Sequence, residues 1–208
     1  MLNNRETTGI NKHKGFSLVE LLIGLLLGSV LLVMIISLYV TGISTGSKSL
    51  KYSRLRSDLQ SLITLIESDI RRAGYGGNEY LVGVGASASF DINDAQNCLV
   101  YYYNHNETAS LQHNNKMAIS LKNRALKFKT GVGQVANTVC ATTNGWVGIS
   151  DDKFVTISDL IFTEMITSSA SATLRSVNIT LTGELASDSQ YNHSISSHVQ
   201  VRNPELSH

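Results

Sequence analysis

The sequence predicts an α+β protein in which a long N-terminal α-helix packs on a C-terminal antiparallel β-sheet domain. An apolar run from Phe16 to Val40 contains a single charged residue. Apolar residues then recur at helical spacing as far as Ala73, and the last part of the chain alternates apolar and polar residues. The chain has 208 residues and a net charge of +1 with scattered basic residues, so the composition indicates no nucleic-acid partner.

The run from Phe16 to Val40 is long enough to cross a bilayer. As a helix it measures about 37 Å, against a hydrocarbon core of about 30 Å. A secretory signal peptide has a shorter apolar region that ends at a small-residue cleavage site. This run has neither feature. We therefore expect residues 16–40 to form a transmembrane segment that stays attached as an anchor.

Glu20 is the only charged residue in the anchor. A carboxylate at the centre of a membrane helix costs roughly 2.5–3.5 kcal/mol, and less near an interface. The same segment contains Gly24 and Gly28, a spacing that lets two helix backbones approach closely in lipid. Glycine is also common in membrane helices, so this pair alone does not decide between a contact site and ordinary composition.

The second half of the predicted helix is amphipathic. Its apolar residues recur at steps of three and four and form one stripe: Leu55, Leu59, Leu62, Ile63, Ile66, Ile70 and Ala73. Gly74, followed by Tyr75, Gly76 and Gly77, is a strong stop signal. We expect a helix over residues 16–73, ending at about Arg72, and a globular β-rich head over 74–208.

Short β-rich runs in the head predict its strands. They are Leu99–Tyr103, Met117–Leu121, Ala125–Thr130, Lys153–Ile157, Val177–Leu181 and Ser194–Asn203. Alternation in the last two runs favours an antiparallel sheet with one wet face. The segment Gly183–Asn192 is interpreted as the connection between them, and Tyr101–Tyr103 are expected to pack alternately on the two sides of a sheet.

Two cysteines, Cys98 and Cys140, lie beyond the anchor. The chain has no closely spaced cysteine pair and no histidine cluster, so one disulfide is favoured over a zinc site. Such a bond contributes roughly 3–4 kcal/mol by the chain-entropy estimate. It also favours an exported head with a cytoplasmic N-terminus, because basic residues on both sides of the anchor leave orientation open. Those residues are Arg5, Lys12, Lys14, Lys48, Lys51, Arg54 and Arg56.

No pattern in the sequence predicts catalysis. The histidines have no carboxylate or serine partner at motif spacing. Asp91, Asn93 and Asn97 alternate loosely like a calcium loop, but Gln96 stands where such a loop needs glycine. We expect neither enzymatic activity, nor a cofactor or metal, nor a small-molecule substrate.

The segment Lys14-Gly15-Phe16-Ser17-Leu18-Val19-Glu20 resembles the cleavage and methylation site of the type IV pilin superfamily, which implies a pilin-like fold. The resemblance implies that prepilin peptidase removes residues 1–15 by cutting after Gly15, and that the new terminal Phe16 is N-methylated. It also implies an assembly role for Glu20. Physically, a buried carboxylate needs a partner charge, and the Phe16 amine of a neighbouring subunit supplies one.

A second stretch, Ser57–Gly77, resembles the helix end of PilW-like minor pilins, with its Asp-Ile-Arg-Arg-Ala-Gly-Tyr sequence. The cysteines lie mid-domain, away from the C-terminal loop that major pilins usually close, which favours a minor subunit. This resemblance implies a protein that starts in the bacterial inner membrane with its head in the periplasm. There it would help to initiate a type IV pilus, in a tip or priming complex with other minor pilins and the major pilin, and so support adhesion and twitching motility.

Two alternatives remain open from the sequence. A minor pseudopilin of a type II secretion system has the same N-terminal chemistry. A single-pass, anchored periplasmic binding domain that never assembles would instead keep an uncleaved N-terminus.

Overall fold

The computed structural model describes residues 15, 17–168, 172–203 and 205–206. Phe16 and residues 1–14 of the predicted leader lie outside the described residues. The chain divides into two units, one ending at Lys48 and the other beginning at Ser49. The first unit contains the anchor, and the second is the folded head together with the last turns of the long helix.

The predicted helix is confirmed as one continuous element, α1, from Leu18 to Ile70. Within the first unit every described residue of α1 is exposed, and its apolar window has a mean hydropathy of 2.9. By length and composition it can cross a membrane. This matches the anchor expected from the sequence.

The helix ends at Ile70, slightly earlier than the predicted Arg72. The backbone N–H of Arg72 donates to the carbonyl of Asp69, and the N–H of Ala73 donates to that of Ile70. These bonds span three residues instead of four, so the chain tightens into turns. Gly74 then adopts a φ of 75°, which only glycine does at low cost.

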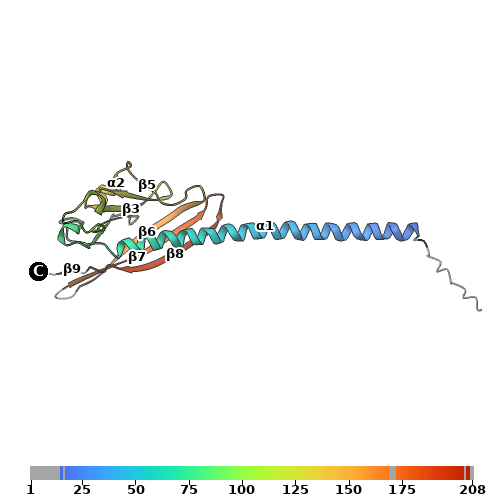
Figure 1. Ribbon diagram of the computed structural model, residues 1–208, viewed down its shortest axis with the longest axis horizontal. Helices are drawn as coiled ribbons and strands as arrows, with labels where there is room; N and C mark the ends of the chain where they lie inside the picture. Colours follow the sequence, from blue (N-terminus) through green and yellow to red (C-terminus); the bar gives the residue numbers. More distant parts are fainter. Residues whose placement is uncertain (1–14, 16, 169–171, 204, 207–208) are drawn as a thin grey trace, which may run out of the picture. The chain divides into compact units, whose positions relative to one another are not determined.

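The head contains two antiparallel sheets (Figure 1). The first has the strand order β1-β2-β3-β4-β5. Its strands are β1 (Phe90–Ile92), β2 (Cys98–Tyr102), β3 (Lys116–Lys122), β4 (Ala125–Thr130) and β5 (Val147–Gly148). The second has the order β6-β7-β8, and β9 also pairs with β7. These strands are β6 (Val155–Ser168), β7 (Ala172–Leu185), β8 (Asp188–Gln200) and β9 (Glu205–Leu206).

Three short helices are present among the described residues of the head. They are η1 (Asn78–Tyr80), η2 (His113–Asn115) and α2 (Ala136–Ala141). The 3-10 helix η2 carries a capping box between Gln112 and Asn115, which satisfies backbone donors that a short helix leaves free.

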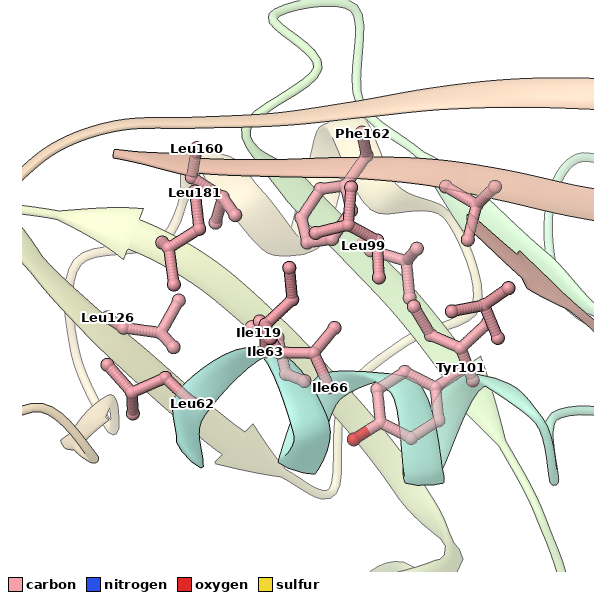
Figure 2. Packing of buried hydrophobic residues seen from close by; sticks show 14 of the residues in the cluster. Leu62, Ile63, Ile66, Leu99, Tyr101, Ile119, Leu126, Leu160, Phe162 and Leu181 are labelled. Atoms are coloured by element: carbon pink, nitrogen blue, oxygen red, sulfur yellow. The ribbon is translucent and has the colours of Figure 1, made fainter. Parts of the chain in front are cut away.

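The main core lies between the apolar stripe of α1 and both sheets. Figure 2 shows Leu62, Ile63 and Ile66 of α1 directed toward residues of the sheets. The sheet residues labelled there are Leu99, Tyr101, Ile119, Leu126, Leu160, Phe162 and Leu181. Burying one such side chain contributes about 1.5–3 kcal/mol. The stripe predicted from the spacing is therefore what holds the last turns of α1 on the head.

A second, smaller cluster covers the other side of the first sheet. It joins Val100 and Tyr102 of β2 to Ala118 of β3 and to Ala136 and Val139 of α2. Tyr101 and Tyr103 belong to the main core, so the three tyrosines alternate between the two sides. This confirms the packing expected from the sequence.

The prediction for the connection between the last two strands was wrong. Gly183 and Glu184 lie inside β7, which continues to Leu185, and β8 already begins at Asp188. Leu185 pairs with Asp188, so a two-residue turn replaces the expected loop. The strand has glycine at this position because a Cβ on Gly183 would lie only 2.8 Å from Cδ2 of Leu59 on α1. The glycine marks a close approach of helix and sheet, and not a break.

The sequence also underestimated β6, which was expected to end at Ile157. It continues to Ser168 after a register shift between Ile157 and Asp159. The buried residues are Val155 and Ile157 before the shift and Leu160 and Phe162 after it. An extra residue of this kind breaks the period-2 pattern on which the prediction relied.

Candidate functional site

The predicted processing site lies at the start of α1. Gly15 is exposed, whereas Phe16 lies outside the described residues, so the predicted cleavage and methylation are not tested by the geometry. The N–H of Leu21 donates to the carbonyl of Ser17, which places Glu20 in the first turn of the helix. A negative charge in the first turn is stabilised by the helix dipole.

Glu20 begins an open groove along one face of α1. The groove is lined by Glu20, Leu21, Gly24, Leu25, Gly28, Ser29, Leu32 and Val33. A Cβ on Gly24 or Gly28 would have no neighbour within 4 Å. This face therefore combines one carboxylate with space for the backbone of another helix to come close. The assembly role of Glu20 remains a prediction, since it concerns a second subunit.

The end of α1 is fixed to β2 through Asp69. Its carboxylate accepts hydrogen bonds from the hydroxyls of Tyr101, at 2.6 Å, and Tyr103, at 3.3 Å. The Arg72 guanidinium donates to the same carboxylate at 2.6 Å. Arg72 also lies over the Tyr103 ring, 4.5 Å from its centroid. The Asp-Ile-Arg-Arg-Ala-Gly-Tyr stretch thus has a structural role, because it ties the helix end to the sheet.

Burial raises the pKa of the Tyr101 phenol well above its usual value, and the nearby Asp69 carboxylate raises it further. The pKa of Tyr103 is raised for the same two reasons. Burial alone raises the pKa of Tyr102 to about 12. All three phenols therefore stay protonated at physiological pH and act as hydrogen-bond donors.

The structure joins Cys98 and Cys140 in a disulfide, with a Cα–Cα distance of 6.1 Å. The bond connects the start of β2 to α2. Close by, the Lys122 ammonium donates to the Cys140 carbonyl at 2.6 Å. The disulfide favoured by the sequence is therefore present, and it lies mid-domain as expected.

The oxygen-rich run that begins in β1 stabilises a local turn and the start of α2. Asp91 accepts a hydrogen bond from the Ala136 N–H at 2.6 Å. The Asn93 side chain accepts bonds from the N–H groups of Asn97 and Cys98. Among the described residues, no group of three His, Cys, Asp or Glu side chains is arranged to hold a metal ion.

The sequence did not predict two polar contacts to the second sheet, one made by α1 and one made by the residue just before β4. Glu67 of α1 accepts a hydrogen bond from Ser197 of β8, and Arg124, just before β4, pairs with Glu184 of β7. Both pairs are distant in sequence and of common residue types, so no local pattern could have indicated them.

Two parts of the chain match known protein families. Residues 48–201 match the family described as prepilin peptidase-dependent protein B. The chain belongs to this family. Residues 10–36 match the prokaryotic N-terminal methylation motif, a range that includes Gly15, Phe16 and Glu20. No curated protein and no solved structure matches the chain.

This member of the prepilin peptidase-dependent protein B family is thus a type IV pilin-like prepilin, a pilin-type protein processed by prepilin peptidase. The apolar helix and the leader together make it a membrane-anchored, single-pass protein. Prepilin peptidase is therefore one of its partners.

Proposed function

We propose that this protein is a PilW-like minor pilin that helps to initiate a type IV pilus, in a tip or priming complex, and so supports adhesion and twitching motility. The observation that carries the proposal is the exposed apolar helix whose only charge before Lys48, Glu20, lies one turn from the processing site. The mid-domain disulfide and the helix-end stretch Asp69–Tyr75 support a minor subunit.

The mechanism is physical. Alone in lipid, the Glu20 carboxylate has no partner and its burial is costly. In a bundle of staggered helices it meets the methylated Phe16 amine of a neighbour, which is either another minor pilin or the major pilin. This pairing, together with the close approach allowed at Gly24 and Gly28, favours transfer of the helix from lipid into the bundle.

The compartment follows from the same reasoning. Before assembly the protein lies in the bacterial inner membrane, with its N-terminus in the cytoplasm where the leader is removed. The disulfide between Cys98 and Cys140 supports a periplasmic head, because such bonds persist in oxidising compartments. After assembly the head belongs to the extracellular pilus.

We propose further that the protein is a structural subunit and not an enzyme. The carboxylates of Asp69, Glu67 and Asp91 are engaged in contacts that hold the helix end, the sheets and α2 together. Prepilin peptidase acts on this chain, and the chain in turn acts through assembly.

Replacing Glu20 tests the proposal. In Glu20→Gln the side chain keeps its size and loses its charge, so cleavage and membrane insertion should persist while recovery with other pilin-type subunits falls about tenfold, the effect of roughly 1.4 kcal/mol. Thr41→Val is the control on the same helix but outside the groove, since the Thr41 hydroxyl donates to the Ser37 carbonyl of its own helix. Equal recovery of wild type and Glu20→Gln would contradict the assembly mechanism.

Deletion of the whole chain separates the pilus from a secretion system. The proposal predicts fewer pili and loss of twitching, with normal protein secretion. Normal pili with defective secretion would contradict it and would favour a minor pseudopilin of a type II secretion system.

A further inference from the structure

The free edge of the second sheet is β8, a strand of 13 residues. Among the described residues β8 pairs on one side only, with β7. The regular register covers residues 192–200, and at about 3.3 Å per residue this part of the edge is roughly 30 Å long. Half of the backbone N–H and C=O groups of such a strand point away from the sheet and are available to another strand.

β8 lacks the features that usually protect an edge. From Ser189 to Gln200 it contains no Lys, Arg, Asp, Glu or Pro, although natural edge strands commonly use these residues to prevent pairing. Its register shift against β7 lies at the hairpin end: Leu185 pairs with Asp188 and Glu184 pairs with Asn192, so residues 189–191 form a bulge. From Asn192 to Gln200 the edge is regular and carries no Lys, Arg, Asp or Glu.

The other edges of the two sheets differ from β8. β1 has three residues and β5 has two, so each offers little backbone. β6 is as long as β7, but it carries Asp159 and Glu164. Its N–H groups at Ile157 and Phe162 already donate to the carbonyls of Arg124 and Gln96. Short length, carboxylate side chains and existing backbone bonds protect these edges, and the structure describes none of the three at residues 192–200 of β8.

The two faces of β8 show what kind of strand would fit beside it. On the helix side, Tyr191, His193 and Ile195 are only half-buried, whereas Ile179 and Leu181 on the adjacent strand β7 are fully buried. On the outer side, Ser194 and Ser196 pair with the hydroxyls of Thr182 and Thr180. An added strand with alternating apolar and hydroxyl or amide side chains would extend both layers.

A second copy of β8 fits this edge poorly. Tyr52 near the start of the head's helix contacts His193, and Glu67 near its end contacts Ser197, so helix and strand run in the same direction. Two antiparallel β8 strands would therefore bring the helices of two copies together in opposite directions. The start of the head, at Ser49, would then lie at opposite ends of the pair in the two copies, which disfavours this pairing for two chains that enter their heads from one membrane.

Parallel pairing of two β8 strands fails for another reason. If two β8 edges pair in parallel, one copy must be rotated by 180° about the strand direction, which inverts its sheet. The helix-covered face of one copy would then be continuous with the outer face of the other. Half-buried Ile195 would then lie beside a row of hydroxyl and amide groups. The partner strand must therefore come from a different chain.

We infer that β8 is the docking edge for an uncharged strand, with alternating apolar and hydroxyl or amide residues, from the head of a different pilin-type subunit. This inference rests on the proposed function, which brings such heads together on neighbouring anchors. Strand addition joins the heads through backbone hydrogen bonds, while the anchors pair through Glu20.

Amide hydrogen exchange of the full chain tests this directly. The chain is purified in detergent, alone and in complex with the other pilin-type subunits of its host. In the complex, exchange of the outward-facing amides of residues 192–200 should slow at least about tenfold, because they gain carbonyl partners. Amides of β1 and β5 in the same sample should change little.

A matched pair of double variants adds a functional readout. Ser194→Lys with Ser196→Lys places two charges on the edge strand, and recovery of the complex should fall about tenfold or more. Thr163→Lys with Thr167→Lys places the same two charges on exposed positions of the same face, but on β6. This control should recover the complex within about twofold, and both variants should be cleaved and should unfold at similar temperatures.

The outcomes separate this inference from the proposed function. A complex in which residues 192–200 exchange as fast as in the free chain overturns the inference alone, and so does equal loss of complex in both double variants. Failure of the wild-type chain to join any pilin-type subunit overturns both. Protection of β8 with selective loss in the Ser194→Lys, Ser196→Lys variant supports the inference.

Discussion

At the scale of single residues, Asp69 shows how one carboxylate can fix the end of a helix. It accepts hydrogen bonds from the hydroxyls of Tyr101 and Tyr103, and it forms an ion pair with Arg72. Tyr101 is fully buried in the main core (Figure 2), and its hydroxyl donates to Asp69 of α1. Without that acceptor, the buried hydroxyl would cost about 1–3 kcal/mol. The sequence indicated that the tyrosines alternate, but it gave no sign of their shared partner on the helix.

The raised pKa values of these tyrosines predict how stability depends on pH. Below about pH 10 the phenols are protonated in both the folded and unfolded states, so the full stability is present. Above pH 10 the unfolded chain loses these protons while the folded head retains them, because burial raises the pKa of Tyr101 and of Tyr102, the latter to about 12. The free energy of unfolding should therefore fall by up to about 1.4 kcal/mol per pH unit for each phenol.

Denaturant unfolding of the full chain in detergent between pH 9 and about 11.5 measures this fall. Tyr101→Phe removes one titrating group, so its curve should be less steep by up to one phenol's share. A wild-type free energy of unfolding that stays constant across this range would show that the tyrosines are not protected in the folded state.

At the scale of elements, the fold was predictable wherever one periodicity held over a long stretch. The stripe on α1 and the alternation at Val177–Leu181 satisfied this condition, and both elements are present. The prediction failed at two local events. A register shift hides the continuation of β6 beyond Ile157, and the turn at Ala186–Ser187 has none of the Asn-Gly or Gly-Gly signals of tight hairpins.

Gly183 was mistaken for a loop residue, and this error leads to a prediction about helix–sheet packing. In Gly183→Ala the new Cβ would lie 2.8 Å from Cδ2 of Leu59 and 3.3 Å from Cγ1 of Val155. The head should lose about 1–3 kcal/mol of stability as α1 is pushed from the sheet. Thermal or denaturant unfolding of the purified chain measures the loss.

Gly148→Ala is the matched control, since a Cβ on this β5 glycine would have nothing within 4 Å. Its effect should stay within about 0.5 kcal/mol. If both substitutions were equally costly, loss of glycine itself, and not the contact with Leu59, would account for the change.

At the scale of the whole molecule, the chain combines an anchor whose surface suits lipid with a head whose surface suits water. The anchor exposes apolar side chains along α1 up to Lys48, whereas the head buries its own stripe beginning at Leu55. Exposed apolar surface of this extent needs lipid or other helices to cover it. A processed prepilin meets both in turn, first in the membrane and then in an assembly.

The predicted site at Gly15, Phe16 and Glu20 came from a sequence motif and not from packing, since Gly15 and Glu20 are exposed and Phe16 lies outside the described residues. Its meaning depends on a covalent change and on a second subunit, and a single chain displays neither. The free β8 edge is the reverse case. It appears only once the sheet is assembled, because the sequence alone had divided that strand between a loop and a shorter strand.

Mass spectrometry of the N-terminus of the mature protein tests the central claim most directly. The account predicts a chain that begins at Phe16 and carries one N-methyl group, with the leader of residues 1–15 removed. A mature chain that still begins at Met1, or that is cut at another position, would contradict it and would favour an anchored domain that does not assemble.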